Sequence, residues 1–148
     1  MTKNIFSLAH QLKETHETNN PKELCAILGI SYVVADLPDS IKGFYMEDCG
    51  RQAVVVSDSL TERQRKVCAA HELGHAVLHK GMNAVFITEN TNLTLGKFER
   101  EADLFATSLL LCDEFTEEYS STQSISTDIG LPEYAIQSYA SFICNQKR

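Results

Sequence analysis

The chain has 148 residues, of which 43% are hydrophobic and 22% are charged, so its size and composition are those of one globular domain of a soluble protein. It carries 20 acidic residues against 13 basic ones, a net charge of −7, which speaks against binding to a nucleic-acid backbone, because such binding depends on Lys and Arg. No apolar run reaches the ~20 residues of a membrane-spanning helix, and the N-terminus lacks the pattern of a signal peptide.

The cysteines are scattered along the chain and form no CxxC pair, which argues against a disulfide framework and fits a reducing cytoplasm. We interpret them as small buried apolar residues. Only Cys68 is a candidate spare metal ligand, because it lies three residues before His71 on the same helical face. The full set is Cys25, Cys49, Cys68, Cys112 and Cys144.

Residues 1–30 are expected to form two helices. Apolar residues recur at helical spacing in NIFSLAHQL, which predicts a first amphipathic helix. The following NNPKELCAILGI carries the signals of a second helix, with Asn20 as its N-cap and Pro21 at its first position. Glu23 is expected to complete a capping box, and Gly29 to end the helix.

The pattern then changes to short β-branched and aromatic runs, SYVVA, KGFYM and QAVVVS, which predict a small sheet. Ser59 with Glu62 resembles a capping box, so a helix is expected from about Leu60 to Lys80, closed by Gly81. Farther along, AVFIT predicts another strand, and a helix is expected from about Phe98 to Leu111.

The tail STQSISTDIGLPEYAIQSYASF predicts two short helices broken at Gly130-Leu131-Pro132. Such a pattern is also typical of a DNA-reading helix-turn-helix. The segment has no Lys or Arg before Lys147, however, so we do not expect it to bind DNA.

The sequence HELGH, residues 71–75, falls inside one of the expected helices. Because residues four apart share a helix face, His71 and His75 can offer two imidazole nitrogens to one zinc ion. Glu72 projects at a neighbouring angle, close enough to act as general base toward a water molecule at the metal. The alternative interpretation is an ordinary helix that contains two histidines by chance. It is the weaker one, because the motif lies in a helix with a clear N-terminal cap signal.

A catalytic zinc site usually has three protein ligands, and FEREADLFA supplies candidates for the third. Glu99 and Asp103 are four residues apart, so both can face the first helix. We expect Glu99 to be the ligand and Asp103 to orient one histidine through its other ring nitrogen. Glu101 should point roughly the opposite way, which makes it the weaker candidate. Without HELGH, the segment would be read as a solvated charged face.

A second group is usually needed to stabilise negative charge on the attacked carbonyl. His79, Tyr134 and Tyr139 are candidates, and nothing in the sequence selects among them. For His79, which lies about 80° from the direction of His71 on an ideal helix, a packed histidine at the helix end is the favoured interpretation.

Four segments, TNNPKELCAILGI, KGFY, HELGHAVLH and FEREADLFATSLLL, occur in an order and spacing similar to the ImmA/IrrE family of metallo-endopeptidases. The resemblance covers about Thr18 to Tyr139. It implies an α+β fold of the minimal gluzincin-like zincin type, in which a small mixed or antiparallel sheet packs against the HExxH helix and further helices. It also implies one Zn²⁺ ion, and these residues for its site: His71, His75 and Glu99 as ligands, Glu72 as catalytic base, and Asp103 behind a ligand.

The resemblance further implies a cytoplasmic zinc endopeptidase of a mobile element or stress response. Its protein substrate would be a DNA-binding helix-turn-helix repressor. From its charge and its short apolar runs, we expect this chain itself to contact neither nucleic acid nor a membrane directly. The chain departs from the family in two places: Cys112 stands where Pro is common, and Val56-Ser57-Asp58 stands where Asn is common. These departures concern the end of a helix and the end of a strand, and leave the expected zinc ligands intact.

We expect one domain over residues 1–148, with N-terminal helices over 1–30, a zinc-binding core over 31–112 and a C-terminal helical segment over 113–148. If QAVVVS lies at an exposed sheet edge, an extended peptide could pair with it as an added strand. Two other functions stay open: a zinc-dependent binding or sensor protein that sequesters a repressor without cutting it, and a hydrolase of a non-peptide amide.

Overall fold

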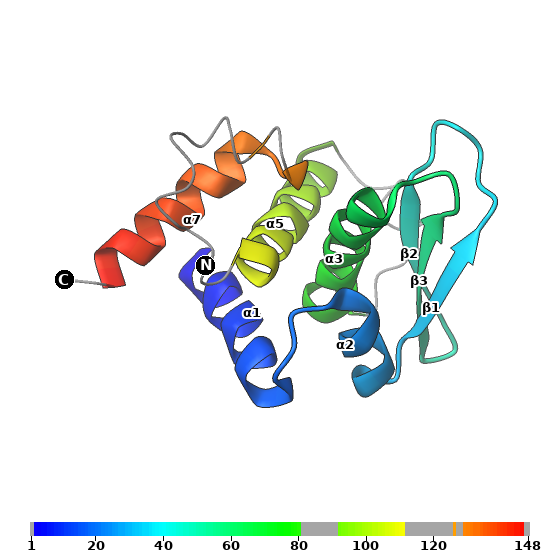
Figure 1. Ribbon diagram of the computed structural model, residues 1–148, viewed down its shortest axis with the longest axis horizontal. Helices are drawn as coiled ribbons and strands as arrows, with labels where there is room; N and C mark the ends of the chain where they lie inside the picture. The colour runs from blue at the N-terminus through cyan, green and yellow to red at the C-terminus, as the bar shows by residue number, and fades with distance from the viewer. Residues whose placement is uncertain (1, 81–91, 112–125, 127–128, 147–148) are drawn as a thin grey trace.

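The computed structural model describes residues 2–80, 92–111, 126 and 129–146. Helices and a small sheet form an α+β arrangement, as expected, with α3 between the sheet and α5 (Figure 1). The elements, in chain order, are α1 (Thr2–His16), α2 (Pro21–Leu28), β1 (Ser31–Ala35), β2 (Gly43–Asp48), β3 (Arg51–Ser57), α3 (Glu62–Leu78), α5 (Asn92–Leu111) and α7 (Glu133–Gln146).

The sheet is mixed, with strand order β1-β3-β2. β1 runs parallel to β3, and β2 runs antiparallel to it through a two-residue turn. Both turn residues, Cys49 and Gly50, have positive φ, the conformation that favours a tight hairpin. The condition that QAVVVS lies at an exposed sheet edge is therefore not met, because this run is β3 and pairs on both sides. Val54 and Val56 of β3 are fully buried against the helical side of the sheet.

Asn20 and Gly29 cap α2 as expected, but Glu23 completes no capping box there, because the Asn20 amide donates to the Thr18 hydroxyl instead; the cap of α3 also differs from expectation. The Asn20 side chain accepts a hydrogen bond from the Lys22 amide, and Gly29 ends α2 with φ 75°. In α3 the capping box consists of Thr61 and Gln64, with bonds of 3.2 and 3.0 Å, and not of Ser59 and Glu62. The Ser59 hydroxyl is instead paired with Ser57 in the preceding turn. α3 also ends at Leu78, two residues earlier than expected.

The helices α3 and α5 approach closely at Gly74. A Cβ atom at this position would lie 3.2 Å from both Ala102 Cα and the Phe105 ring. Both of these neighbours are fully buried, so neither can move into solvent. This contact sets the separation of the two helices and brings the histidine face of α3 opposite the acidic residues of α5.

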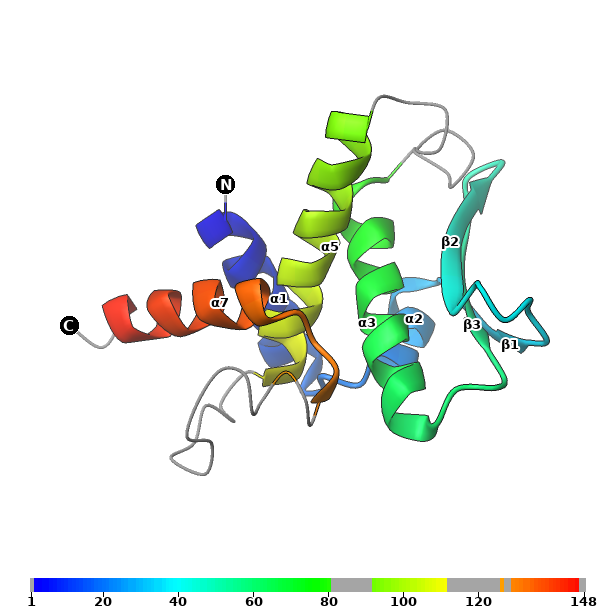
Figure 2. The same ribbon diagram turned by 90° about the horizontal axis from the view of Figure 1, so that it is seen from above.

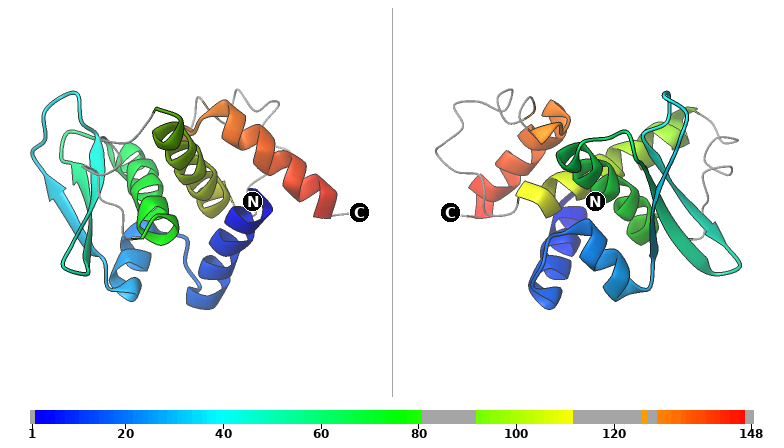
Figure 3. Two further views of the ribbon diagram at one scale, coloured as in Figure 1. Left: turned by 180° about the vertical axis from the view of Figure 1, so that it is seen from behind. Right: turned by 45° about the vertical axis from the view of Figure 1, so that its right-hand side comes forward.

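The remaining helices surround this pair. α1 and α7 pack on α5 (Figure 2), and α2 packs against α3 and β1 (Figure 3). α5 begins at Asn92, earlier than the expected Phe98. Gly130, with φ 89°, precedes α7 and confirms the expected break in the tail. The expected strand AVFIT, residues 84–88, and the expected helix end at Cys112 lie outside the described residues.

Two further observations concern the whole of the described chain. Cys25 is buried and Cys68 half-buried, but Cys49 and Cys144 are exposed, so the interpretation of all the cysteines as buried apolar residues is wrong for these two. No helix within the described ranges has the length and apolar character that crossing a membrane requires.

Candidate metal centre

The HELGH motif lies on the part of α3 that packs against α5. His71 and His75 are one turn apart, with ring centroids 4.9 Å apart. One nitrogen from each ring and a carboxylate oxygen of Glu72 all lie within 4.8 Å of one another. Glu72 and His75 are buried, and His71 is half-buried. The motif therefore gathers three groups that can bind a metal or a proton on a largely buried part of α3.

Glu99 of α5 joins the two histidines. Its carboxylate lies 2.9 Å from His71 Nε2 through one oxygen and 3.1 Å from His75 Nε2 through the other. Both Nε2 atoms therefore point toward the same place from α3, and an oxygen donor meets them from α5. These contacts hold the pKa of Glu99 well below its ordinary value, since the hydrogen bonds from His71 and His75 favour the carboxylate.

Two carboxylates thus lie beside the histidine rings, with different surroundings. Glu99 reaches both Nε2 atoms, whereas Glu72 belongs to the same helix as the rings and is more deeply buried. Burial raises the pKa of Glu72 and the charges of His71 and His75 partly oppose that rise. A carboxylate whose pKa lies above the ordinary value is better suited to accept and release a proton near neutral pH.

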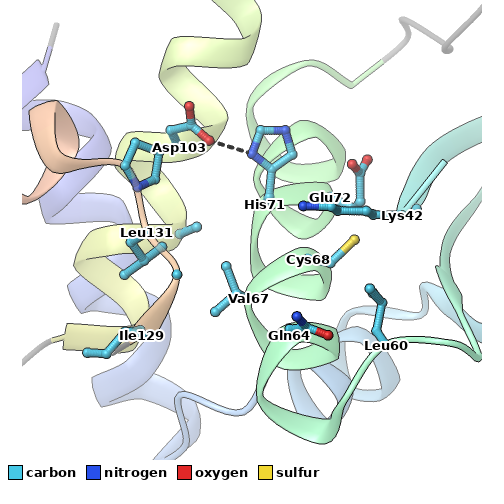
Figure 4. A pocket seen from close by; sticks show the side chains of 14 residues that line it. Lys42, Leu60, Gln64, Val67, Cys68, His71, Glu72, Asp103, Ile129 and Leu131 are labelled. Carbon is cyan, nitrogen blue, oxygen red and sulfur yellow. Dashed lines mark hydrogen bonds and ion pairs between the residues drawn. The ribbon is translucent and has the colours of Figure 1, made fainter. Parts of the chain in front are cut away.

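His71 is held from behind by Asp103. The ring nitrogen Nδ1 lies 2.8 Å from an oxygen of Asp103, as Figure 4 shows across the space between α3 and α5. Burial alone would lower the pKa of His71, but the hydrogen bonds to Asp103 and Glu99 outweigh burial and raise this pKa to about 10. Without a metal, His71 is therefore an imidazolium at neutral pH, with a proton on the nitrogen that faces Glu99.

Tyr134 is bonded to this same carboxylate. Its hydroxyl donates to the second oxygen of Asp103 at 2.5 Å, and the guanidinium of Arg100 lies 5.8 Å from its ring centroid. Burial and the bond to Asp103 raise the pKa of Tyr134. Asp103 is therefore held between two side chains, with one oxygen at His71 and the other at Tyr134.

Tyr139 and His79, the other two candidates for a second stabilising group, are both buried and contact other side chains. Tyr139 is fully buried, and its hydroxyl lies 2.7 Å from His10 Nε2, between α7 and α1. His79 lies behind His75, with 2.9 Å between their Nδ1 atoms. The structure thus does not bring either residue to a place where it could contact the attacked carbonyl.

Glu101 was expected to point away from the first helix, and this expectation is wrong. Its carboxylate lies 3.3 Å from His79 Nε2, at the C-terminal end of α3. α3 and α5 lie side by side in close contact, so a residue between Glu99 and Asp103 in sequence still reaches the last turn of α3. Burial lowers the pKa of His79, although the bond to Glu101 acts in the other direction.

A cavity of about 370 Å³ adjoins His71 and Glu72. It lies between α3, the start of β2 and the residues just before α7 (Figure 4). Its walls are largely apolar, and the apolar members are Leu60, Val67, Ala106, Ile129, Leu131 and Pro132. A cavity of this size, next to Glu72 and to the imidazole of His71, is suited to one large side chain of a substrate.

Lys42, which also lines this cavity, was missed by the sequence reasoning. The segment KGFYM predicts only a strand, and the glycine at its second position is the one signal in the sequence that another part of the chain approaches there. A Cβ atom there would lie 2.5 Å from Cys68 Sγ, so only glycine lets β2 begin this close to α3. The Cys68 thiol therefore lies against the start of β2. Burial, with a further contribution from Glu72, raises the Cys68 pKa to about 12, which does not favour a metal-binding thiolate.

The donor set fits a divalent metal such as zinc. Two imidazole nitrogens and a carboxylate converge from two helices, and each imidazole has a hydrogen-bond partner on its other nitrogen. These are ligand types and supporting contacts that zinc sites in proteins commonly have.

Comparisons with known proteins identify the family of the chain. A family model described as "IrrE N-terminal-like domain" matches residues 25–138, which include HELGH and Glu99. The "Uncharacterized immunity region protein 2" of Bacillus phage phi105 is 34% identical over 127 residues, covering 86% of this chain and 80% of that protein. "Metallopeptidase ImmA" of Bacillus subtilis (strain 168) is 30% identical over 117 residues, covering 79% of this chain and 69% of that protein. No solved structure gives a significant match. The chain belongs to the ImmA/IrrE family of metallopeptidases.

Proposed function

We propose that this metallopeptidase is a zinc-dependent endopeptidase that cuts a protein substrate, a DNA-binding repressor. The observation that carries the proposal is the convergence of His71 Nε2, His75 Nε2 and the Glu99 carboxylate, with the buried Glu72 beside them. These three groups would hold the ion. A bound zinc ion supplies Lewis-acid polarisation of a carbonyl and lowers the pKa of a water molecule.

Glu72 is the proposed general base. It takes a proton from the water molecule as the water oxygen forms a bond to the scissile carbonyl carbon. The same carboxyl group then delivers that proton to the amine nitrogen as the C–N bond breaks. The raised pKa of Glu72, caused by burial, supports both halves of this transfer. Asp103 orients His71 through its Nδ1–H, and Tyr134 holds Asp103 in turn.

An extended peptide is the substrate form that the surroundings favour. Among the residues that the structure describes, β2 forms an outer edge of the sheet, and its first residue, Gly43, borders the same cavity as Glu72. A peptide paired with this edge would run past the site, held by main-chain hydrogen bonds. One side chain of the peptide would enter the apolar cavity. Peptide pairing is therefore assigned to β2 and not to the central strand β3.

The choice of a repressor as substrate is supported by the relatives. One of them is named for a phage immunity region and another is the metallopeptidase ImmA, and the family resemblance implies action on helix-turn-helix repressors. The net charge of −7 also suits a basic, DNA-binding protein partner.

The test combines metal analysis with intact mass measurement. Wild-type protein and the Glu72→Gln variant are purified, their zinc content is measured, and each is incubated with the repressor encoded beside the gene. We expect zinc in both proteins and repressor fragments only with wild type, whose masses give the cut site. His71→Ala should lose the zinc.

The other results would contradict the proposal in different ways. Fragments from Glu72→Gln at the wild-type rate would remove Glu72 from the mechanism. Zinc retained by His71→Ala would show that the ligands are wrong. Zinc in wild type with no fragments, but with a stable complex, would identify a protein that sequesters the repressor without cutting it.

A further inference from the structure

His75 is backed by a second histidine and a carboxylate that the mechanism above does not use. Its Nδ1 atom lies 2.9 Å from Nδ1 of His79, and His79 Nε2 lies 3.3 Å from an oxygen of Glu101. These contacts form one line from the proposed metal ligand to an acidic residue of α5.

The positions of the protons along this line follow from one another. If His75 binds a metal through Nε2, its remaining proton must be on Nδ1, where it needs an acceptor. His79 Nδ1 is the atom at that distance, so it must present a lone pair. The proton of a neutral His79 is then on Nε2, from which it can be donated to the Glu101 carboxylate. A carboxylate accepts such a bond but cannot donate one, and it therefore selects one tautomer for both rings.

The surroundings of His79 keep the line in place. His79 is 4% exposed, and its ring lies against that of Phe98, with centroids 4.4 Å apart. The Glu101 side chain is 17% exposed, compared with 47% for Glu99. A ring packed on one face and bonded at both nitrogens has little freedom to turn, and bonds in such an environment are stronger than in water.

The two proposed imidazole ligands are therefore supported in different ways. His71 donates directly to a carboxylate, Asp103, which itself accepts from Tyr134. His75 reaches its carboxylate only through a neutral imidazole. If Glu101 were lost, His79 could adopt its other tautomer and direct an N–H toward the N–H of His75, which would turn the His75 ring away from the metal.

We infer that His79 and Glu101 are positioning residues, which fix the tautomer and direction of the His75 ring and thereby increase the metal affinity of the site. The inference rests on the proposed function, because it takes His75 as a ligand through Nε2. It assigns His79 a role behind the metal site and away from the substrate.

The test measures zinc affinity by competition with a chelator, together with the histidine tautomers in zinc-loaded protein by long-range ¹H–¹⁵N NMR. The variants are Glu101→Gln, which keeps the size but lets the side chain donate as well as accept, and His79→Phe, which removes the acceptor. Glu14→Gln, an exposed position of α1, is the matched control. Glu101→Asp tests whether a carboxylate restores what the amide loses.

We expect about 10–100-fold weaker zinc binding in Glu101→Gln and His79→Phe, a smaller loss in Glu101→Asp, and no change in Glu14→Gln. Wild type should show His75 protonated on Nδ1 and His79 on Nε2, whereas Glu101→Gln should show His79 in both tautomers. A residue that only supports the fold would not change this pattern.

Unchanged zinc affinity in Glu101→Gln, or His79 protonated on Nδ1 in wild type, would overturn the inference while leaving the peptidase proposal standing. Should His79→Phe fail to fold, Glu101→Gln decides alone. A wild-type protein that binds no zinc would overturn both.

Discussion

The close approach of α3 and α5 at Gly74 can be tested by adding one methyl group. In Gly74→Ala the new Cβ would lie 3.2 Å from Ala102 Cα and from the Phe105 ring, and 3.3 Å from the Ala102 carbonyl oxygen. Ordinary contacts of this kind are about 3.5–4.0 Å, so the two helices must separate by a few tenths of an ångström. Overpacking a tight core in this way costs about 1–3 kcal/mol.

Two effects of opposite sign act in this variant. Replacing glycine by alanine inside a helix stabilises it by about 0.5–1 kcal/mol. Gly96 on α5 offers a matched control, because it is exposed and a Cβ there meets no atom within 4 Å. Gly96→Ala should show only the stabilisation that alanine gives inside a helix. Gly74→Ala should have a free energy of unfolding about 1–3 kcal/mol lower than that control.

The assay is urea unfolding of metal-free protein in the presence of a chelator, since bound zinc would add its own stabilisation. Zinc affinity is then measured separately. It should fall in Gly74→Ala, because Glu99 moves away from His71 and His75, and should stay unchanged in Gly96→Ala. Equal stability of the two variants would refute the reasoning, because it would mean that the helices do not meet at Gly74.

Three other outcomes are expected. Asp103→Asn should weaken zinc binding about 10–100-fold, measured by chelator competition, and unchanged affinity would contradict the role given to this carboxylate. In metal-free protein the pKa of His71 is raised from 6.5 to about 10, so the charged form of His71 stabilises the fold fully below pH 6.5 and this stabilisation is lost as the pH rises toward 10. Urea unfolding between pH 6 and about 10 should show a falling free energy of unfolding. A free energy that does not change with pH would contradict the stabilisation assigned to charged His71. Thr61→Ala should cost about 1 kcal/mol through loss of the α3 cap, and a larger effect of Ser59→Ala in the same unfolding assay would favour the box expected from the sequence.

Sequence reasoning succeeded for the shared helix faces and for the ends of α2, although it placed the cap of α3 two residues too early. The four-residue spacing of His71 and His75 requires a shared face in any α-helix, and the same holds for Glu99 and Asp103. The signals at Asn20 and Gly29 also act within a few residues, and they gave the ends of α2 correctly.

It failed where the answer depends on how separate elements pack. The position of Glu101 follows from the offset between α3 and α5, and that offset is set by the contact of Gly74 with Ala102. The bond from Tyr134 to Asp103 requires α7 to pack on α5. Strand order is a similar case, because a run such as QAVVVS has the same alternation whether it lies at the edge or the centre of a sheet.

The origin of the proposed ligands in just α3 and α5 has a consequence for how such peptidases can diversify. The cavity beside the site is walled in part by the start of β2 and by residues 129–132, which provide none of those ligands. Exchanging these wall residues between relatives should therefore change which peptides are accepted while the metal is retained. In this architecture the chemistry and the choice of target can evolve on separate stretches of the chain.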